Sequence, residues 1–139
     1  MDITNPAYIE ELKMIVKKSP YPKHMGMSLD NIGIDRANIV LNIADYHLQP
    51  FGIVHGGVIS TLIDTATFWA AFLRLPEDTG LVNVDLKLNY LCSVSKGKLT
   101  AKGSCLHQGP ITSCFYPQVL LLDINVLFLM FWVLILDFR

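Results

Sequence analysis

Apolar side chains recur at three- and four-residue spacing between residues 5 and 18, which predicts an amphipathic helix. Its apolar face comprises Tyr8, Leu12, Ile15 and Val16. Asn5 suits the N-cap, Pro6 suits the first helical position, and Pro22 lies in the segment that ends the helix. We interpret this helix as packing material or as a lid, without chemistry of its own.

From about residue 27 to residue 44 the apolar residues alternate with polar ones, which predicts one long half-buried strand. An irregularity is expected within it near residues 30–33. Residues 81–91 alternate in the same way, and a further strand is expected from about 97 to 107. The inward positions of the first and last of these strands are Ala37, Ile39, Leu41, Ile43, Leu99, Ala101, Gly103 and Cys105. In residues 81–91, one face carries Val82, Val84, Leu86, Leu88 and Tyr90, and the other carries Asn83, Asp85, Lys87 and Asn89.

A mostly apolar helix is expected from about Gly57 to Leu73, between the first and second strands. Asp64 is the only charged residue between His55 and Arg74, so its carboxylate either reaches water at the helix edge or lies in a cleft. One long helix among successive antiparallel strands predicts an α+β fold in which the sheet wraps around the helix.

The chain changes character after Gly109. Residues 119–136 are almost entirely large and apolar, and only Asp123 and Asn125 interrupt them. One interpretation is a pair of strands with a turn near residues 123–125 and an unusually apolar outer face. A membrane span is a second, although the uninterrupted run is shorter than the roughly 20 residues that a span needs. A shifted reading frame in the source is a third.

Length and charge limit the class of protein. The 139 residues suit one domain, comprising an N-terminal helix and linker over 1–22 and an atypical tail over 111–139. The net charge of -1 does not indicate a basic surface, so we expect no nucleic-acid partner. The three cysteines show no metal-type or redox spacing, and no secretory signal is visible, so we expect buried or free thiols and a cytoplasmic protein.

The sequence His55-Gly56-Gly57 directly precedes the apolar helix. Backbone N–H groups at a helix start have no partner within the helix, and the helix dipole places positive charge there. A carbonyl oxygen or an anion is therefore stabilised near Gly56 and Gly57, where glycine lets a ligand approach the backbone. No second His or Cys lies beside His55 at ligand spacing, so no metal is expected.

The run HGGVISTLIDTA resembles the HGG-x6-D signature of hotdog-fold thioesterases, in the phenylacetate-pathway (PaaI-like) branch. The preceding segment 48–54 and the later strand that ends in Asn89-Tyr90 also fit this family. The resemblance extends from about Ile32 to Gly109, and the tail departs from the family pattern. It implies a hotdog fold and an acyl-CoA thioesterase that needs no cofactor.

The resemblance assigns roles to individual residues. Asp64 would be a general base that activates water, or a direct nucleophile, and the sequence does not separate the two. The Gly56 N–H would stabilise the oxyanion, and His55 would fix the geometry of the site. Gln49 stands where the family commonly has an Asn that holds the motif loop or the carbonyl. Asn83 stands where a small polar residue often orients the water, although it could equally lie on a solvated strand face.

Family members build the site between two subunits, with the HGG loop of one facing the Asp of the other. The resemblance therefore implies a homodimer or homotetramer, an acyl-CoA substrate and no membrane partner. The aromatic residues Phe68, Trp69 and Phe72 could line the pocket or belong to the core. A non-catalytic acyl-CoA sensor on the same fold is the main alternative, and Asp64 argues against it. A hotdog dehydratase would need a different loop.

Overall fold

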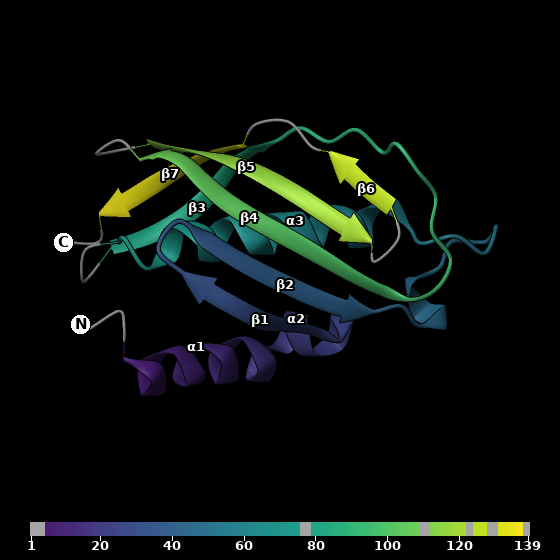
Figure 1. Ribbon diagram of the computed structural model, residues 1–139, viewed down its shortest axis with the longest axis horizontal. Helices are drawn as coiled ribbons and strands as arrows, with labels where there is room; N and C mark the ends of the chain where they lie inside the picture. Colours follow the sequence, from purple (N-terminus) through teal and green to yellow (C-terminus); the bar gives the residue numbers. More distant parts are fainter. Residues whose placement is uncertain (1–4, 76–78, 109–111, 122–123, 128–130, 138–139) are drawn as a thin grey trace.

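The computed structural model describes residues 5–75, 79–108, 112–121, 124–127 and 131–137 (Figure 1). The helices are α1 (Pro6–Lys18), α2 (Pro20–Met25) and α3 (Gly56–Phe72), with a short 3₁₀ turn at Asp45–His47. The strands are β1 (Met27–Gly33), β2 (Arg36–Asn42), β3 (Thr79–Leu86), β4 (Lys98–Gln108), β5 (Thr112–Leu121), β6 (Ile124–Leu127) and β7 (Phe131–Asp137). The predicted α+β class and the predicted central helix are confirmed.

The described strands form one antiparallel sheet in the order β1-β2-β4-β5-β7-β3, with β6 paired to β5. Figure 1 shows the sheet curving around α3, which lies against its concave side. The helix turns Leu62, Ile63 and Ala66 toward the sheet, where all three are fully buried. The helix that carries the motif is thus a central part of the hydrophobic core.

The backbones of the sheet and the helix lie very close together at Gly103 of β4. A Cβ atom at this position would lie 2.6 Å from the carbonyl carbon of Ala66 and 3.0 Å from the backbone nitrogen of Thr67. Glycine therefore allows backbone to pack on backbone, and the depth at which α3 sits in the sheet depends on that contact.

The predicted N-terminal helix is confirmed as α1, and the side chain of its N-cap Asn5 accepts a hydrogen bond from the Ala7 N–H at 3.0 Å. The expected linker after it is partly wrong, because residues 20–25 form the second helix α2. Pro20 suits the first helical position, and Gly26 ends α2 in the left-handed conformation at φ 65°. Both helices pack beside β1.

The prediction of one long strand over residues 27–44 is wrong, since these residues form the β1–β2 hairpin. Gly33 pairs with Arg36, so the turn consists of Ile34 and Asp35, and Asp35 has a φ of 61°. The alternation of apolar and polar residues continues through such a two-residue turn, so the hairpin has the same sequence pattern as one long strand. The guanidinium of Arg74 after α3 hydrogen-bonds the Asp35 carboxylate, which raises the pKa of Arg74.

The strand predicted over 81–91 is shorter than expected, because β3 ends at Leu86. A bulge between Asn83 and Asp85 interrupts its alternation. Val82 and Val84 are 43% and 62% exposed, whereas Asn83 is half-buried. The next predicted strand is confirmed as β4, with Leu99, Ala101 and Gly103 buried and Cys105 half-buried.

The described residues of the tail form β5, β6 and β7, where two strands were expected. The chain reverses direction close to the turn predicted near residues 123–125, because β5 and β6 pair antiparallel with Leu121 opposite Ile124. Ile124 and Asn125 themselves lie in β6. Asp123, Gly109 and the side chains that would form the apolar outer face lie outside the described residues. Among the helices that the structure describes, none has the length and apolar character needed to cross a membrane.

Candidate active site

His55 caps the N-terminus of α3. Its backbone is extended (φ -63°, ψ 135°), and its Nδ1 accepts a hydrogen bond from the Gly57 N–H at 2.9 Å. Its carbonyl accepts from the Val58 N–H, also at 2.9 Å. The Gly56 N–H has no partner within the described part of the chain, so it is the donor at the helix start that remains available to a ligand.

A second histidine anchors the loop that leads into the motif. The His47 side chain is 1% exposed, and its Nδ1 accepts from the Ala44 N–H at 2.9 Å. Nε2 therefore carries the proton and donates to the Met25 carbonyl at 3.0 Å. The His47 carbonyl accepts from the His55 N–H at 2.9 Å. No sequence pattern singles out His47, since a lone loop histidine carries no sign of burial.

Gln49 and Gly56 line the same cavity of about 350 Å³. The other lining residues are Ile53, Val54, Ile59, Tyr90, Leu91, Cys92, Ser93 and Val94. The Val54 N–H donates to the Val94 carbonyl at 2.7 Å, which ties the loop before α3 to the segment after β3. The structure thus brings Gln49 to the available N–H group at the helix start.

Tyr90 is a site residue that the sequence placed only as part of a strand. Its hydroxyl donates to the Gly56 carbonyl at 3.3 Å, and its ring lies 3.2–3.4 Å from where a Cβ of Gly56 would be. Residues 87–97 form no strand in the structure, and this allows the Tyr90 ring to turn over the helix start. The one signal in the sequence was the Asn-Tyr ending of the family resemblance.

Asp64 lies two turns further along α3, half-buried and in contact with β3. The Asn83 Nδ2 donates to the Asp64 carboxylate at 2.5 Å and to the Asp64 backbone carbonyl at 3.0 Å. The Asn83 Oδ1 is buried and has no hydrogen-bond partner among the described residues. Asn83 therefore faces the helix, and the interpretation of a solvated strand face is wrong for this residue.

The candidate residues form two groups within one chain. His55, Gly56 and Gln49 lie at the start of α3, whereas Asp64 and Asn83 lie beside the middle of the helix. Asp64 lies eight positions after Gly56 in the α-helix, which is about 12 Å along the axis. In the described residues no group of three or more His, Cys, Asp or Glu side chains could hold a metal ion.

A sheet wrapped around one long helix is the architecture of the hotdog fold, and the solved structures of thioesterases described below share it. Residues 51–120 match the family model described as the thioesterase superfamily. The chain belongs to this family, and it is a thioester hydrolase. The predicted family, the predicted hotdog fold and the predicted enzyme class are confirmed.

Several relatives have names that describe related activities. A candidate esterase of Haemophilus influenzae is 31% identical over 101 residues, 73% of this chain and 72% of that protein. The proofreading thioesterase EntH of Cronobacter turicensis is 25% identical over 93 residues, 67% and 68% of the two chains. A 1,4-dihydroxy-2-naphthoyl-CoA hydrolase of Listeria monocytogenes is 27% identical over 88 residues, 63% and 72% of the two chains.

The solved structures agree in fold. The crystal structure of a thioesterase from Haemophilus influenzae superposes with a TM-score of 0.83 at 24% identity, over 93% of this chain and 90% of that one. A candidate esterase from Mycobacterium tuberculosis superposes with a TM-score of 0.80 at 25% identity, over 87% and 99%. Both structures match the chain over most of its length.

Proposed function

We propose that this thioesterase hydrolyses acyl-CoA and that Asp64 is its catalytic carboxylate. The observation that carries the proposal is the Asn83–Asp64 hydrogen bond, which holds a half-buried carboxylate in one orientation on an otherwise uncharged helix. Binding an acyl-CoA without reaction, as a sensor would, needs no such group. The CoA hydrolase among the relatives supports the choice of carrier.

The reaction requires a base and a water molecule. Asp64 takes a proton from water, and the hydroxide oxygen forms a bond to the thioester carbonyl carbon. The carbon–sulfur bond then breaks, and the sulfur leaves as CoA thiolate and takes the proton that Asp64 removed from water, which restores the carboxylate. Asn83 would act through Asp64, because its Nδ2 donates to the carboxylate and holds it in one orientation. Direct attack by the Asp64 carboxylate is the alternative route.

Negative charge on the carbonyl oxygen builds up during the attack. The Gly56 N–H is available and lies at the positive end of α3, so it would donate to this oxyanion. His55 would act on the site through its cap, which fixes the first turn of the helix. Gln49 lies in the same cavity, where its amide would contact the carbonyl or the thioester sulfur.

The length of α3 favours a site shared by two subunits. An oxyanion donor must lie about 2.7–3.1 Å from the oxygen. The base reaches the same carbonyl carbon through one water, so the two groups cannot be about 12 Å apart along one helix. The proposed site therefore pairs Gly56 of one subunit with Asp64 of a second copy.

The edge of the sheet offers a place for that second copy. In the described sheet, β3 pairs with β7 on one side only, and Val82 and Val84 are exposed on it. An unpaired strand with exposed apolar residues is a site for pairing with another chain. Asn83 belongs to the same strand, so a dimer formed along β3 would place Asp64 near the subunit boundary. We propose a homodimer as the minimal active unit.

Thiol release from a panel of acyl-CoA thioesters tests the activity. The purified chain should release free CoA from aryl or medium-chain substrates. Tight binding of every substrate without thiol release would instead favour the sensor.

Subunit mixing tests the shared site. Gly56→Pro removes the N–H donor at a position where proline is tolerated, and the extended His55 before it suits a proline. Gly56→Ala is the matched control, because it keeps the N–H while it also adds a carbon against the Tyr90 ring. Co-expression of Gly56→Pro with Asp64→Asn should restore activity through one intact and one doubly damaged site in each mixed dimer. No restoration in verified mixed dimers would contradict the shared site.

A further inference from the structure

A row of three residues begins at the edge strand β3 and leads along α3 onto the face that the sheet leaves open. Asp64, Phe68 and Phe72 follow one another at four-residue spacing, so they lie along one side of the helix. All three are half-buried, in contrast to the fully buried side chains on the sheet side. Apolar surface thus begins one turn beyond the proposed catalytic carboxylate.

Aromatic rings make this surface continuous. The ring centroids of Phe68 and Phe72 are 6.1 Å apart, with the rings 30° from parallel. The Trp69 ring lies 4.8 Å from Phe72 and widens the surface on one side. From Asp64 to Phe72 the row extends about 12 Å along the helix.

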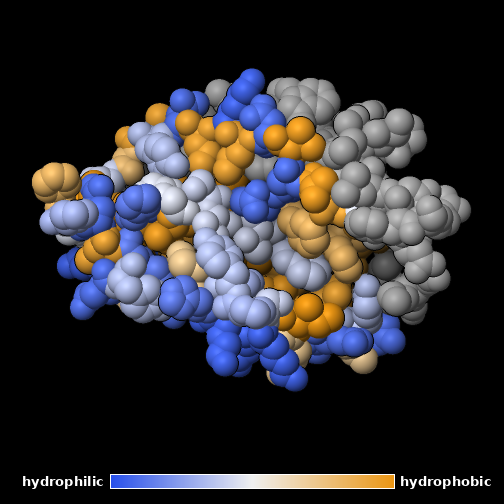
Figure 2. Space-filling view, turned by 180° about the vertical axis from the view of Figure 1, so that it is seen from behind, coloured by the Kyte–Doolittle hydropathy of each residue, from blue (hydrophilic) through white to orange (hydrophobic). Residues whose placement is uncertain are grey.

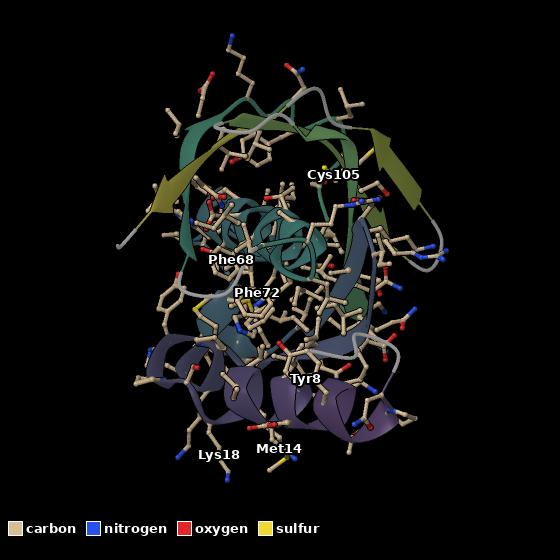
Figure 3. All side chains as sticks on the ribbon, turned by 90° about the vertical axis from the view of Figure 1, so that its left-hand side faces the viewer. Tyr8, Met14, Lys18, Phe68, Phe72 and Cys105 are labelled. Atoms are coloured by element: carbon tan, nitrogen blue, oxygen red, sulfur yellow. The ribbon has the colours of Figure 1, made fainter. Side chains whose placement is uncertain are left out.

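A groove of about 550 Å³ lies between the end of this row and helix α1. It is lined by Asn5, Ala7, Tyr8, Glu11, Leu12, Ile15 and Phe72. Figure 3 shows Phe68, Phe72 and Tyr8 one below another between α3 and α1, with Met14 and Lys18 on the far side of α1. Seen from behind, apolar side chains gather on the same open face (Figure 2).

The N-terminal helices bridge the open face without filling it. α1 and α2 pack mainly beside β1, and the Tyr21 hydroxyl hydrogen-bonds the Thr61 hydroxyl of α3 at 2.9 Å. Tyr8 and Ile15 form the α1 wall of the groove, where Ile15 is 47% exposed. The groove volume lies in the usual range for small-molecule sites, which are mostly apolar.

We propose that this groove binds the far end of the acyl group, which runs from Asp64 past Phe68 to Phe72 and under α1. The inference rests on the proposed function of Asp64, since that residue sets where the thioester carbonyl lies. Among the described residues that line the groove, Glu11 is the one charged side chain, and its negative charge disfavours acyl groups that end in a carboxylate. The groove selects an uncharged medium-chain acyl group, and α1 sets its length.

Filling the groove from the α1 side tests the proposal. Ile15→Trp adds bulk at a partly exposed position, so the fold should be retained. The kcat/KM for decanoyl-CoA should fall tenfold or more, as expected when a hydrophobic pocket loses space, while that for acetyl-CoA is unchanged. Met14→Trp is the matched control, because Met14 is 44% exposed on the same helix and does not line the groove.

The outcomes separate the groove from the proposed activity. An unchanged decanoyl-to-acetyl ratio in Ile15→Trp would overturn the groove and leave the hydrolase intact. A change in oligomeric state caused by Ile15→Trp would show that a second copy covers this face, and would overturn it too. If the wild-type chain hydrolyses no thioester, the proposed function fails. Calorimetric binding of decanoyl-CoA then decides the groove, because equal affinity for wild type and Ile15→Trp would exclude it.

Discussion

The side chains on the two sides of α3 differ in how completely they are buried. On the sheet side, Leu62, Ile63, Ala66 and Ala70 are fully buried, and Gly103 of β4 contacts the helix backbone directly. On the open side, the side chains are half-buried and include the carboxylate of Asp64 together with large aromatic rings. One side tolerates no added atom, whereas the other leaves space beside it.

Within this one helix, the residues on the sheet side therefore contribute to stability, and those on the open side contribute to catalysis. Packing on the sheet side fixes the position of α3, and the open side can then carry a charged residue without exposing the core. Substitutions on the sheet side should therefore change the free energy of unfolding, while those on the open side should change turnover. The following substitutions test that separation.

The largest effect is expected for Gly103→Val on the sheet side. Its added carbons would overlap the backbone at Ala66, and backbone cannot move aside as a flexible side chain can. We expect a loss of about 3 kcal/mol or more in the free energy of unfolding, measured by urea denaturation. Lys102→Ala, at an exposed neighbouring position on β4, serves as the control. A stable Gly103→Val variant would show that α3 and the sheet can separate without loss.

On the open side, Asp64→Asn should abolish chemistry while the fold survives. The change removes the charge at nearly constant shape, and loss of a general base should lower kcat on the order of 100-fold. Circular dichroism and the urea midpoint should match those of the wild type. Turnover close to normal would exclude Asp64 as the base.

At the start of α3, His55→Ala should have a smaller effect, which combines a loss of stability with a loss of activity. It removes the acceptor of the Gly57 N–H, and loss of an N-cap lowers stability by about 1 kcal/mol. Because the cap also fixes the Gly56 peptide, kcat should fall as well. His55→Asn, which restores a capping side chain, should recover the stability, and thermal unfolding in parallel with kcat separates the two contributions.

The smallest effect is expected for Arg74→Gln, beyond the end of α3. The Arg74–Asp35 pair is partly exposed, and such pairs contribute little because water and salt screen them. The melting temperature should change only slightly and turnover should not change. A large loss of stability would mean that the pair, and not the apolar packing, holds the β1–β2 turn on α3.

Sequence periodicity predicted the elements whose apolar pattern is regular. α1, α3 and β4 lie where the spacing placed them, and the motif placed Asp64 and Gly56 on the correct helix. The β1–β2 turn was missed because alternation passes through a two-residue turn unchanged. The bulge at Asn83 was also missed, although it helps to set which β3 side chains face the helix.

The site was predicted less completely than the fold. The hydrogen bond between Asn83 and Asp64 joins residues that are distant in sequence. The position of the Tyr90 ring over Gly56 depends on where β3 ends. Neither contact follows from a local pattern. Family resemblance supplied the candidates, and tertiary packing determined which of them contact one another.

The His55 cap has a further consequence for how this chain can vary. Because the cap fixes the first residue of α3, the direction in which Asp64 points is set by counting residues from it. One residue inserted between Gly57 and Asp64 would rotate the carboxylate by about 100° around the helix axis, away from Asn83. The six residues between Gly57 and Asp64 can therefore be substituted wherever packing allows. Their number cannot change, because it sets the direction of the Asp64 side chain.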